Sequence, residues 1–397
     1  MRISSLRTLR ADGGWRAFSF LRMETDDGLV GWSEFSEGAW APGLADVIRA
    51  LGEHVVGADP RAWGLISARL HSLTQFTAGG LSHQAQAAIE NACLDIAAKA
   101  AGVPVYRLFG GPLRQQVELY WSHCGSFRVR HPELFRTVLN RPRITGLPDI
   151  QKLGTEAAER GFRAVKTNPI AFEASGPVLL NPGFVPQGLN LGRTLNEATL
   201  AGIVAQCLAL RIGLGPARGL MLDVNFSLHA GALRRLGRAL TDVGLRWLEV
   251  DVASPAALAS VRSAVPVPIA SLESLHGRQA YQPFLSANAV DIAIVDVLWN
   301  GLAESVRIAS LCETHGVNVA PHNFYGPLGD LMSAHFSAAV PNLEIMEIEG
   351  DDVPWKYELL TRAPEQRDGC FVVPEAPGWG ADVDEVRLAE HPWPRRA

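Results

Sequence analysis

The sequence has few cysteines, no surplus of positive charge and no apolar run that looks long enough to cross a bilayer. Its 5 cysteines are widely spaced among 397 residues and contain no CxxC pair. This pattern argues against a disulfide framework and against a zinc knuckle, and it fits a reducing cytoplasm. A formal net charge of −5 leaves no basic surface for polyphosphate binding, so nucleic acid is not an expected partner.

The chain starts with Met1-Arg2-Ile3 and passes directly into a strand-like pattern. We therefore expect no targeting leader, no membrane partner and a cytoplasmic location. With 47% hydrophobic and 19% charged residues, the chain can bury a large core, and its length favours two domains.

The N-terminal region predicts a small α+β unit. Residues 15–35 predict two strands joined at Asp27-Gly28, because this dipeptide tolerates the positive φ angles of a tight hairpin. Residues 82–101 predict a helix whose apolar side chains recur on one face. Ser82 can cap the start of this helix and Gly102 can end it.

From about Val117 onwards, short apolar strands alternate with amphipathic helices, which indicates parallel βαβ units. Eight such units close a barrel of roughly 250 residues. We therefore predict an α/β fold in which residues 117–366 form a TIM-like barrel. Residues 1–116 form an α+β capping domain in this prediction, and residues 367–397 return to it. Polar residues end the later strands at intervals of 23 to 26 residues, namely Asp223, Glu249, Glu273, Asp296, His322 and Glu347.

One interval is about twice as long as the others. Between Asn168 and Asp223 the surplus, residues 171–194, is rich in proline, glycine and asparagine. Loops of this length in a compact domain are usually functional lids or disordered segments. Because it follows a strand, we expect it to lie over the barrel mouth.

Three carboxylates end three successive strands: Asp223, Glu249 and Glu273. Polar residues at the C-terminal ends of barrel strands point into one basin, where like charges repel unless a cation lies between them. Hard oxygen ligands of this kind suit Mg²⁺. Each residue alone could instead cap a helix or pair with an arginine, but three in phase favour a metal site.

Asp296 and His322 end the next two strands and would be neighbours. A carboxylate that holds one imidazole nitrogen fixes the tautomer and raises the basicity of the other nitrogen, so His322 is the best candidate base. Glu347, on the eighth strand, could donate to or balance a substrate oxygen, or it could form a salt bridge at the rim. We interpret three further histidines as structural, namely His335, His276 and His123. His123 ends the first barrel strand, and its structural interpretation is the least secure.

These segments together resemble the enolase superfamily and, within it, the mandelate racemase-like branch. The resemblance spans nearly the whole chain and rests on AVKTN, LDVN, WLEV, IASLES, IVDVLWNG, VAPH and EIMEIE, and on AIENACLDIAAKAAGVPVYRLFGG before the barrel. It implies that a capping domain closes over the site and that Asp296 and His322 form the catalytic dyad. It also implies Mg²⁺ ligands at Asp223, Glu249 and Glu273. The family usually has a second glutamate and a proline after the fourth-strand ligand; here Val250-Asp251 follows, so Asp251 is a competing ligand.

The chemistry shared by the family is removal of a proton next to a carboxylate, which gives a metal-stabilised enediolate. Lys166 would then add positive charge at the carboxylate oxygens; alternatively, its stem packs and its head escapes to the rim. Racemases of the branch have a second lysine where this chain has Asn168, which cannot take a proton, so racemisation is disfavoured. Galactonate-type dehydratases are similar at this lysine-x-asparagine pattern. They carry a histidine acid where this chain has Asn225, which excludes anti elimination by that acid.

We therefore predict a Mg²⁺-dependent dehydratase of a sugar acid. His322 would remove the α-proton and return it to the departing β-hydroxyl on the same face. Asn168 and Asn225 would hydrogen-bond substrate hydroxyls, and Trp299 would line the mouth. Two alternatives stay open: a cycloisomerase of a sugar-acid derivative that uses the same enediolate, and a non-catalytic relative that binds a sugar acid. A homo-oligomer is also expected, because relatives are commonly symmetric assemblies.

Overall fold

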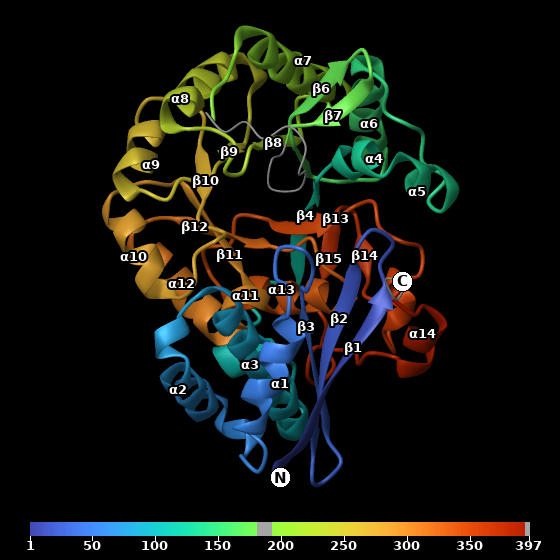
Figure 1. The fold of residues 1–397 in the computed structure, drawn as a ribbon, viewed down its shortest axis with the longest axis vertical. Helices are drawn as coiled ribbons and strands as arrows, with labels where there is room; N and C mark the ends of the chain where they lie inside the picture. The colour runs from blue at the N-terminus through green and yellow to red at the C-terminus, as the bar shows by residue number, and fades with distance from the viewer. Residues whose placement is uncertain (181–192, 394–397) are drawn as a thin grey trace.

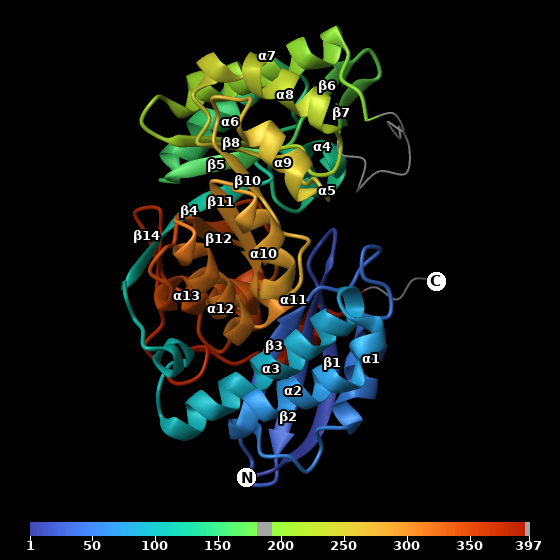
Figure 2. The same ribbon diagram turned by 90° about the vertical axis from the view of Figure 1, so that its left-hand side faces the viewer.

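The computed structural model describes residues 1–180 and 193–393. Figure 1 shows the barrel above a smaller N-terminal unit, with the C-terminal helix α14 beside strand β1. Figure 2 shows the helices of the N-terminal unit on one face of its sheet.

The N-terminal unit is a three-stranded antiparallel sheet covered by helices. The strands are β1 (Ile3–Asp12), β2 (Ala17–Thr25) and β3 (Val30–Phe35), and the helices are α1 (Leu44–Glu53), α2 (Trp63–Leu73) and α3 (Gly80–Ala101). The predicted turn between β2 and β3 is confirmed, since Gly28 has a φ of 87°.

Helix α3 confirms the predicted helix but begins earlier than expected. It ends before Gly102, which has the left-handed φ of 69° that a glycine C-cap adopts. The prediction that Ser82 caps the start is wrong. The helix starts at Gly80, after Gly79 with a φ of 85°, and the Ser82 hydroxyl is instead 2.8 Å from the Thr77 hydroxyl.

Eight parallel strands form the predicted barrel. In order they are β4 (Gln116–Ser122), β5 (Ala164–Thr167), β8 (Gly219–Asp223), β9 (Trp247–Glu249), β10 (Ile269–Ser271), β11 (Ile292–Asp296), β12 (Asn318–His322) and β13 (Met346–Glu349). Strand β13 pairs with β4. The ring closes where Val319 of β12 exchanges 2.8 Å backbone hydrogen bonds with Asn342 and Glu344, just before β13.

Helices between the strands surround this ring. They are α6 (Leu147–Glu159), α7 (Glu197–Leu214), α8 (Ala230–Ala239), α9 (Pro255–Arg262), α10 (Arg278–Ser286), α12 (Leu302–Thr314) and α13 (Pro327–Ala339). The predicted α/β barrel is thus confirmed. Within the described residues, α7 is the one helix whose length and composition would permit a membrane crossing; here it lies on the outside of the barrel against α6.

Shorter elements complete the chain. The described residues include four short helices: α4 (Ser126–Arg130), α5 (Pro132–Thr137), α11 (Val297–Asn300) and α14 (Glu385–Glu390). There are also 3-10 turns at Pro60–Ala62, Gln75–Thr77, Val105–Phe109, Thr241–Val243 and Lys356–Leu359. Strands β6 (Ile170–Glu173) and β7 (Gly176–Leu179) form a hairpin at the start of the predicted insertion. The centre of that insertion, residues 181–192, lies outside the described residues, so the expected position over the mouth stays a prediction.

The C-terminal segment contacts both parts of the molecule. The strands β14 (Gln366–Arg367) and β15 (Cys370–Val372) form a hairpin, and β15 pairs antiparallel with barrel strand β4, which the sequence did not suggest. Beyond it, the Trp379 indole donates to the Trp32 carbonyl at 2.8 Å, and the Asp12 amide donates to the His391 carbonyl at 2.7 Å. The later part therefore packs on the N-terminal sheet.

Candidate active site

The C-terminal ends of the barrel strands gather the predicted polar residues. Lys166 lies in β5, Asp223 and Glu249 end β8 and β9, and Asp296 and His322 end β11 and β12. Two more follow the same edge, with Glu273 two residues after β10 and Glu347 within β13. Parallel strands end at one edge of the barrel, so side chains from distant parts of the sequence meet there.

Lys166 lies at the centre of this group. Its Nζ is 2.8 Å from Oε1 of Glu249, 3.0 Å from Oε1 of Glu347 and 4.0 Å from Oδ2 of Asp223. The side chain is 2% exposed, so its head does not escape to the rim. Burial alone would lower the pKa of Lys166, but the carboxylates of Glu249 and Glu347 outweigh it and raise this pKa well above its ordinary value.

Glu347 is equally enclosed and forms no rim salt bridge. Besides the ion pair with Lys166, its Oε2 accepts a hydrogen bond from the backbone N–H of Asn323 at 2.7 Å, and its Oε1 accepts one from the Ser122 hydroxyl. Burial opposes ionisation, but the charge of Lys166 overcomes it and lowers the pKa of Glu347. Glu347 is therefore an ionised partner of Lys166.

The three predicted metal ligands repel one another. Burial, followed by the charge of Glu249, raises the pKa of Asp223 well above its ordinary value. Burial also raises the pKa of Glu273, with a further contribution from Glu249. Mutual repulsion of this kind is relieved by a cation, and an all-oxygen donor set fits a hard divalent ion such as Mg²⁺.

As the side chains stand, however, they do not form a cage. No group of three or more His, Cys, Asp or Glu side chains within residues 1–180 and 193–393 has metal-holding geometry. Both oxygens of Glu249 are occupied, Oε1 by Lys166 and Oε2 by the Trp247 indole at 2.8 Å. The chemistry of the donors fits the metal, and the ligand assignment stays a prediction.

Asp251 remains a competitor for this role. It is 6% exposed, and burial together with the charges of Glu273 and Asp223 raises its pKa well above the ordinary value. A fourth carboxylate therefore belongs to the same electrostatic cluster. The role of Asp251 as a competing ligand stays a prediction.

Asp296 and His322 are in direct contact. Nδ1 of His322 is 2.5 Å from Oδ2 of Asp296, whose other oxygen accepts the Trp299 amide at 2.8 Å. The far nitrogen, Nε2, is 3.7 Å from Oε2 of Glu273. Burial alone would lower the pKa of His322, but the charges of Glu273 and Asp296 raise it to about 10.

Sequence reasoning missed the residues that hold this dyad. The Tyr325 hydroxyl donates to Oδ2 of Asp296, and the Arg16 guanidinium of the capping domain donates to the carbonyls of Phe324 and Tyr325. Glu34 of β3 accepts the amides of two residues at the start of α13, Gly326 and Gly329. The N-terminal domain thus fixes the loop after His322 through contacts that no local sequence motif predicts.

The three predicted substrate-binding residues have different surroundings. The Asn168 amide is used inside the protein, because it accepts from the Ser126 hydroxyl at 2.8 Å and donates to the Asp223 carbonyl at 3.1 Å. Asn225 is partly exposed and donates to both oxygens of Asp223. The Trp299 ring lies 5.3 Å from the His322 ring. Contact of any of them with a substrate stays a prediction.

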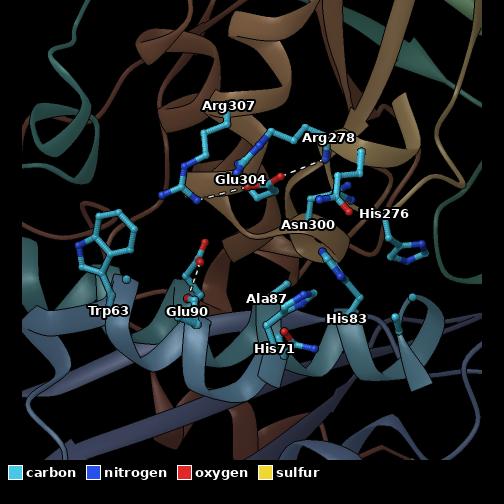
Figure 3. Close-up of a pocket in the computed structure, with 18 residues that line it drawn as sticks. Trp63, His71, His83, Ala87, Glu90, His276, Arg278, Asn300, Glu304 and Arg307 are labelled. Carbon is cyan, nitrogen blue, oxygen red and sulfur yellow. Dashed lines mark hydrogen bonds and ion pairs between the residues drawn. The ribbon is translucent and has the colours of Figure 1, made fainter. Parts of the chain in front are cut away.

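Two of the three histidines interpreted as structural, His335 and His276, have different surroundings. His335 is structural as predicted, since it is fully buried, accepts the Tyr106 amide at 3.2 Å and contacts the Trp379 carbonyl at 3.1 Å. His276 stacks on Trp299 and borders a cavity of about 530 Å³ between α2, α3 and the barrel helices α10 and α12. Figure 3 shows that cavity, which includes none of the predicted site residues.

The family follows from comparison with known proteins. Residues 11–110 match the model of the mandelate racemase / muconate lactonizing enzyme N-terminal domain, and residues 149–387 match that of the enolase C-terminal domain-like family. The chain belongs to the enolase superfamily, in its mandelate racemase-like branch.

Three relatives illustrate the range of this family. A D-galactarolactone cycloisomerase from Agrobacterium fabrum is 29% identical, with 96% of this chain and 92% of that protein covered. A D-xylonate dehydratase from Haloferax volcanii is 27% identical, with 98% and 88% covered. A provisionally assigned L-alanine-DL-glutamate epimerase from Burkholderia xenovorans strain LB400, solved with magnesium and fumarate, is 42% identical. It has a TM-score of 0.94 and coverage of 98% and 96%.

Proposed function

We propose that this protein is a Mg²⁺-dependent dehydratase that removes water from a sugar acid. The observation that carries the proposal is the buried His322–Asp296 dyad beside the Lys166 and carboxylate cluster. A dyad of this kind can move a proton, and the cluster can hold a carboxylate substrate through a divalent cation. The dehydratase and cycloisomerase relatives act on sugar-acid compounds, which supports the substrate class.

The dyad supplies both proton transfers. Asp296 holds Nδ1 of His322, so the proton would be taken and returned at Nε2. After removal of the α-proton, the imidazolium would protonate the departing β-hydroxyl on the same face. The product would be a 2-keto-3-deoxy acid after tautomerisation.

Lys166 supplies fixed positive charge next to the substrate carboxylate. Its buried ion pairs keep it protonated, so it would stabilise negative charge that grows as the α-proton leaves. Mg²⁺ held by Asp223, Glu249 and Glu273 would add charge at the same oxygens and offset the Glu273 carboxylate, which raises the pKa of His322.

Epimerisation, suggested by the Burkholderia xenovorans structure, is disfavoured here. Inversion at a carbon needs a proton acceptor on one face and a donor on the other. The branch's second base would stand at Asn168, whose amide is not an acid or a base at neutral pH and is hydrogen-bonded to Ser126 and Asp223. A single imidazole on one face fits elimination better.

Cycloisomerisation is the second candidate, because the Agrobacterium fabrum relative is a cycloisomerase. The same proton abstraction would serve, with a ring oxygen leaving in place of hydroxide. A non-catalytic sugar-acid binder is less well supported, since a buried and oriented base has no purpose in binding alone.

One experiment separates these functions. The protein is incubated with MgCl₂ and a panel of aldonates, aldarates and sugar-acid lactones, and the products are measured by mass spectrometry. Loss of water supports the dehydratase, and rearrangement at constant mass supports the cycloisomerase. Thermal stabilisation without turnover would indicate a binder. Added EDTA should abolish turnover, and a full rate in EDTA would contradict the metal requirement.

We also propose a cytoplasmic homo-oligomer. Several apolar side chains on α2 and the turn after it are exposed, namely Leu65, Leu73 and the fully exposed Phe76. Exposed apolar side chains that cluster on a surface often mark a protein interface. Light scattering of the purified protein gives its mass in solution, and a monomer would contradict the proposal.

A further inference from the structure

His123 belongs to the wall of the barrel mouth. It follows β4 directly, and its φ of 49° is unusual for a residue other than glycine. The Phe324 ring lies between two histidines, with centroids 5.1 Å from His123 and 5.2 Å from His322. A strained backbone beside a candidate base suggests a functional position.

The hydrogen bonds of Ser122 determine where His123 carries its proton. The Ser122 hydroxyl has one hydrogen, and it donates to Oε1 of Glu347, a carboxylate that Lys166 keeps ionised and that can only accept. The same hydroxyl is 2.8 Å from Nδ1 of His123. Because its hydrogen is already used, Ser122 must accept there, and Nδ1 of His123 must carry the proton.

The other acidic neighbour does not compete for this nitrogen. Oε2 of Glu349 is 3.6 Å from Nδ1 of His123, which is too far for a hydrogen bond. The tautomer is thus set by the chain of contacts from Lys166 through Glu347 and Ser122.

The second nitrogen of His123 is left as an acceptor. Nε2 makes no hydrogen bond with the described residues, and the side chain keeps 10% exposure. Burial, with the charge of Lys166, lowers the pKa of His123 to about 3 although Glu347 opposes this shift. The imidazole is therefore neutral at physiological pH, with a lone pair at Nε2.

We propose that Nε2 of His123 accepts a hydrogen bond from a hydroxyl group of the sugar acid, which makes His123 a specificity-determining residue. This inference rests on the proposed function. An acceptor-only atom selects a hydroxyl donor and disfavours a carboxylate or carbonyl oxygen at the same place. The matching substrate class is an aldonate whose hydroxyl, rather than a second carboxylate, reaches His123.

Proton transfer is not the role of this residue. Without a hydrogen, Nε2 cannot protonate a leaving group, and so weakly basic an imidazole is a poor base at neutral pH. His123 would act through binding, which leaves the proton transfers to His322.

The test separates binding from turnover by using the His322→Asn protein as the parent. Titration calorimetry with MgCl₂ measures the Kd of D-galactonate, D-xylonate and L-lactate, the last of which lacks the distal hydroxyls. In His123→Asn the amide can still donate to Ser122 but presents nothing at the Nε2 position. In His123→Gln the longer side chain returns an amide oxygen to that position.

We expect His123→Asn to weaken binding of the better aldonate by about tenfold and His123→Gln to restore most of it, with L-lactate unaffected. In the enzyme with intact His322, His123→Asn should raise KM and leave kcat nearly unchanged.

Two results would overturn the inference while the proposed function stands. One is unchanged aldonate affinity in His123→Asn, and the other is an equal loss of affinity for L-lactate, which would indicate a structural role. A further result would also overturn the inference: the enzyme inverts the configuration of the α-carbon in D₂O, and substitution of His123 abolishes this inversion. That result would identify His123 as a second base. Failure of the parent to bind any aldonate would remove the proposed function and the inference with it.

Discussion

The barrel interior has two layers that the same strands build two residues apart. The lower layer is apolar and buried, and includes Tyr120, Ala164, Met221, Trp247, Ile294, Ala320 and Ile345. Two residues after each of these come the polar residues of the mouth: Ser122, Lys166, Asp223, Glu249, Asp296, His322 and Glu347. Side chains two apart on a strand share a face, so one geometry delivers both layers.

The two layers differ in what keeps them in place. The apolar layer is stabilised by removal of its side chains from water. The polar layer has equally buried charges that would be costly alone and are held by pairing, as in the contacts of Lys166 with Glu249 and Glu347. Substitutions in the polar layer should therefore change the chemistry, and substitutions in the apolar layer should change the stability.

The largest effect is expected at the base. His322→Asn should reduce exchange of the α-proton in D₂O by about 10⁴, since one imidazole would supply both proton transfers in the proposed mechanism. Proton NMR of an aldonate substrate measures the exchange. His71→Asn, on the exposed side of α2, is the control and should exchange normally. Exchange that persists in His322→Asn would reveal a different base.

Removal of the central charge should have the next largest effect. Lys166→Met should lower kcat by about 10²–10³, the usual loss when one charge-stabilising group is removed from an active site. Steady-state kinetics measures this, with Lys152→Met as a surface control because that side chain is 78% exposed. A wild-type kcat in Lys166→Met would mean that Lys166 has only a packing role.

The apolar layer should respond in stability alone. Ile294→Ala removes buried methyl groups and should cost about 2–5 kcal/mol, whereas Ile294→Val should cost about 0.5–1.5 kcal/mol. Thermal unfolding gives the ranking, and kcat of the folded variants should stay close to wild type. A large fall in kcat with little loss of stability would show that the two layers are not separable.

Glu90 is a buried carboxylate away from the mouth, and it should affect the pH dependence of stability. Burial raises the pKa of Glu90 to about 7, opposed by its hydrogen bonds from Ser67 and the Ala303 amide. A carboxyl whose pKa is raised on folding binds its proton more tightly in the folded state, so stability falls as pH rises from the ordinary value of 4.5 to about 7. The Glu90 contribution to this fall is up to about 3 kcal/mol.

Glu90→Gln should remove that part of the pH dependence, because the amide does not titrate. Unfolding midpoints of wild type and variant at pH 5 and pH 8 measure it, and the pH profile of kcat serves as the control. The difference between the two midpoints should be smaller in the variant. An unchanged difference would mean that Glu90 keeps an ordinary pKa.

Much of this arrangement could be predicted because the signals are local. The strand that ends in Asp223 and the one that ends in His322 each have an apolar run followed by a polar residue, and regular spacing orders them around a barrel. The predicted start of α3 was wrong for a local reason, because the helix already begins at Gly80, after Gly79 with its positive φ, and Ser82 lies inside it. Tyr325 and Arg16 could not be found, since their partners lie in other strands or in another domain.

The barrel, its order of strands and most of the polar residues at its mouth follow from the sequence alone, because strand alternation and spacing are properties of neighbouring residues. Which of these residues touch depends on the tertiary structure. It turned Lys166 towards Glu249 and Glu347, used the Asn168 amide inside the protein and fixed the tautomer of His123 through Ser122. Those choices depend on directional contacts between segments far apart in the chain, which a linear pattern does not encode.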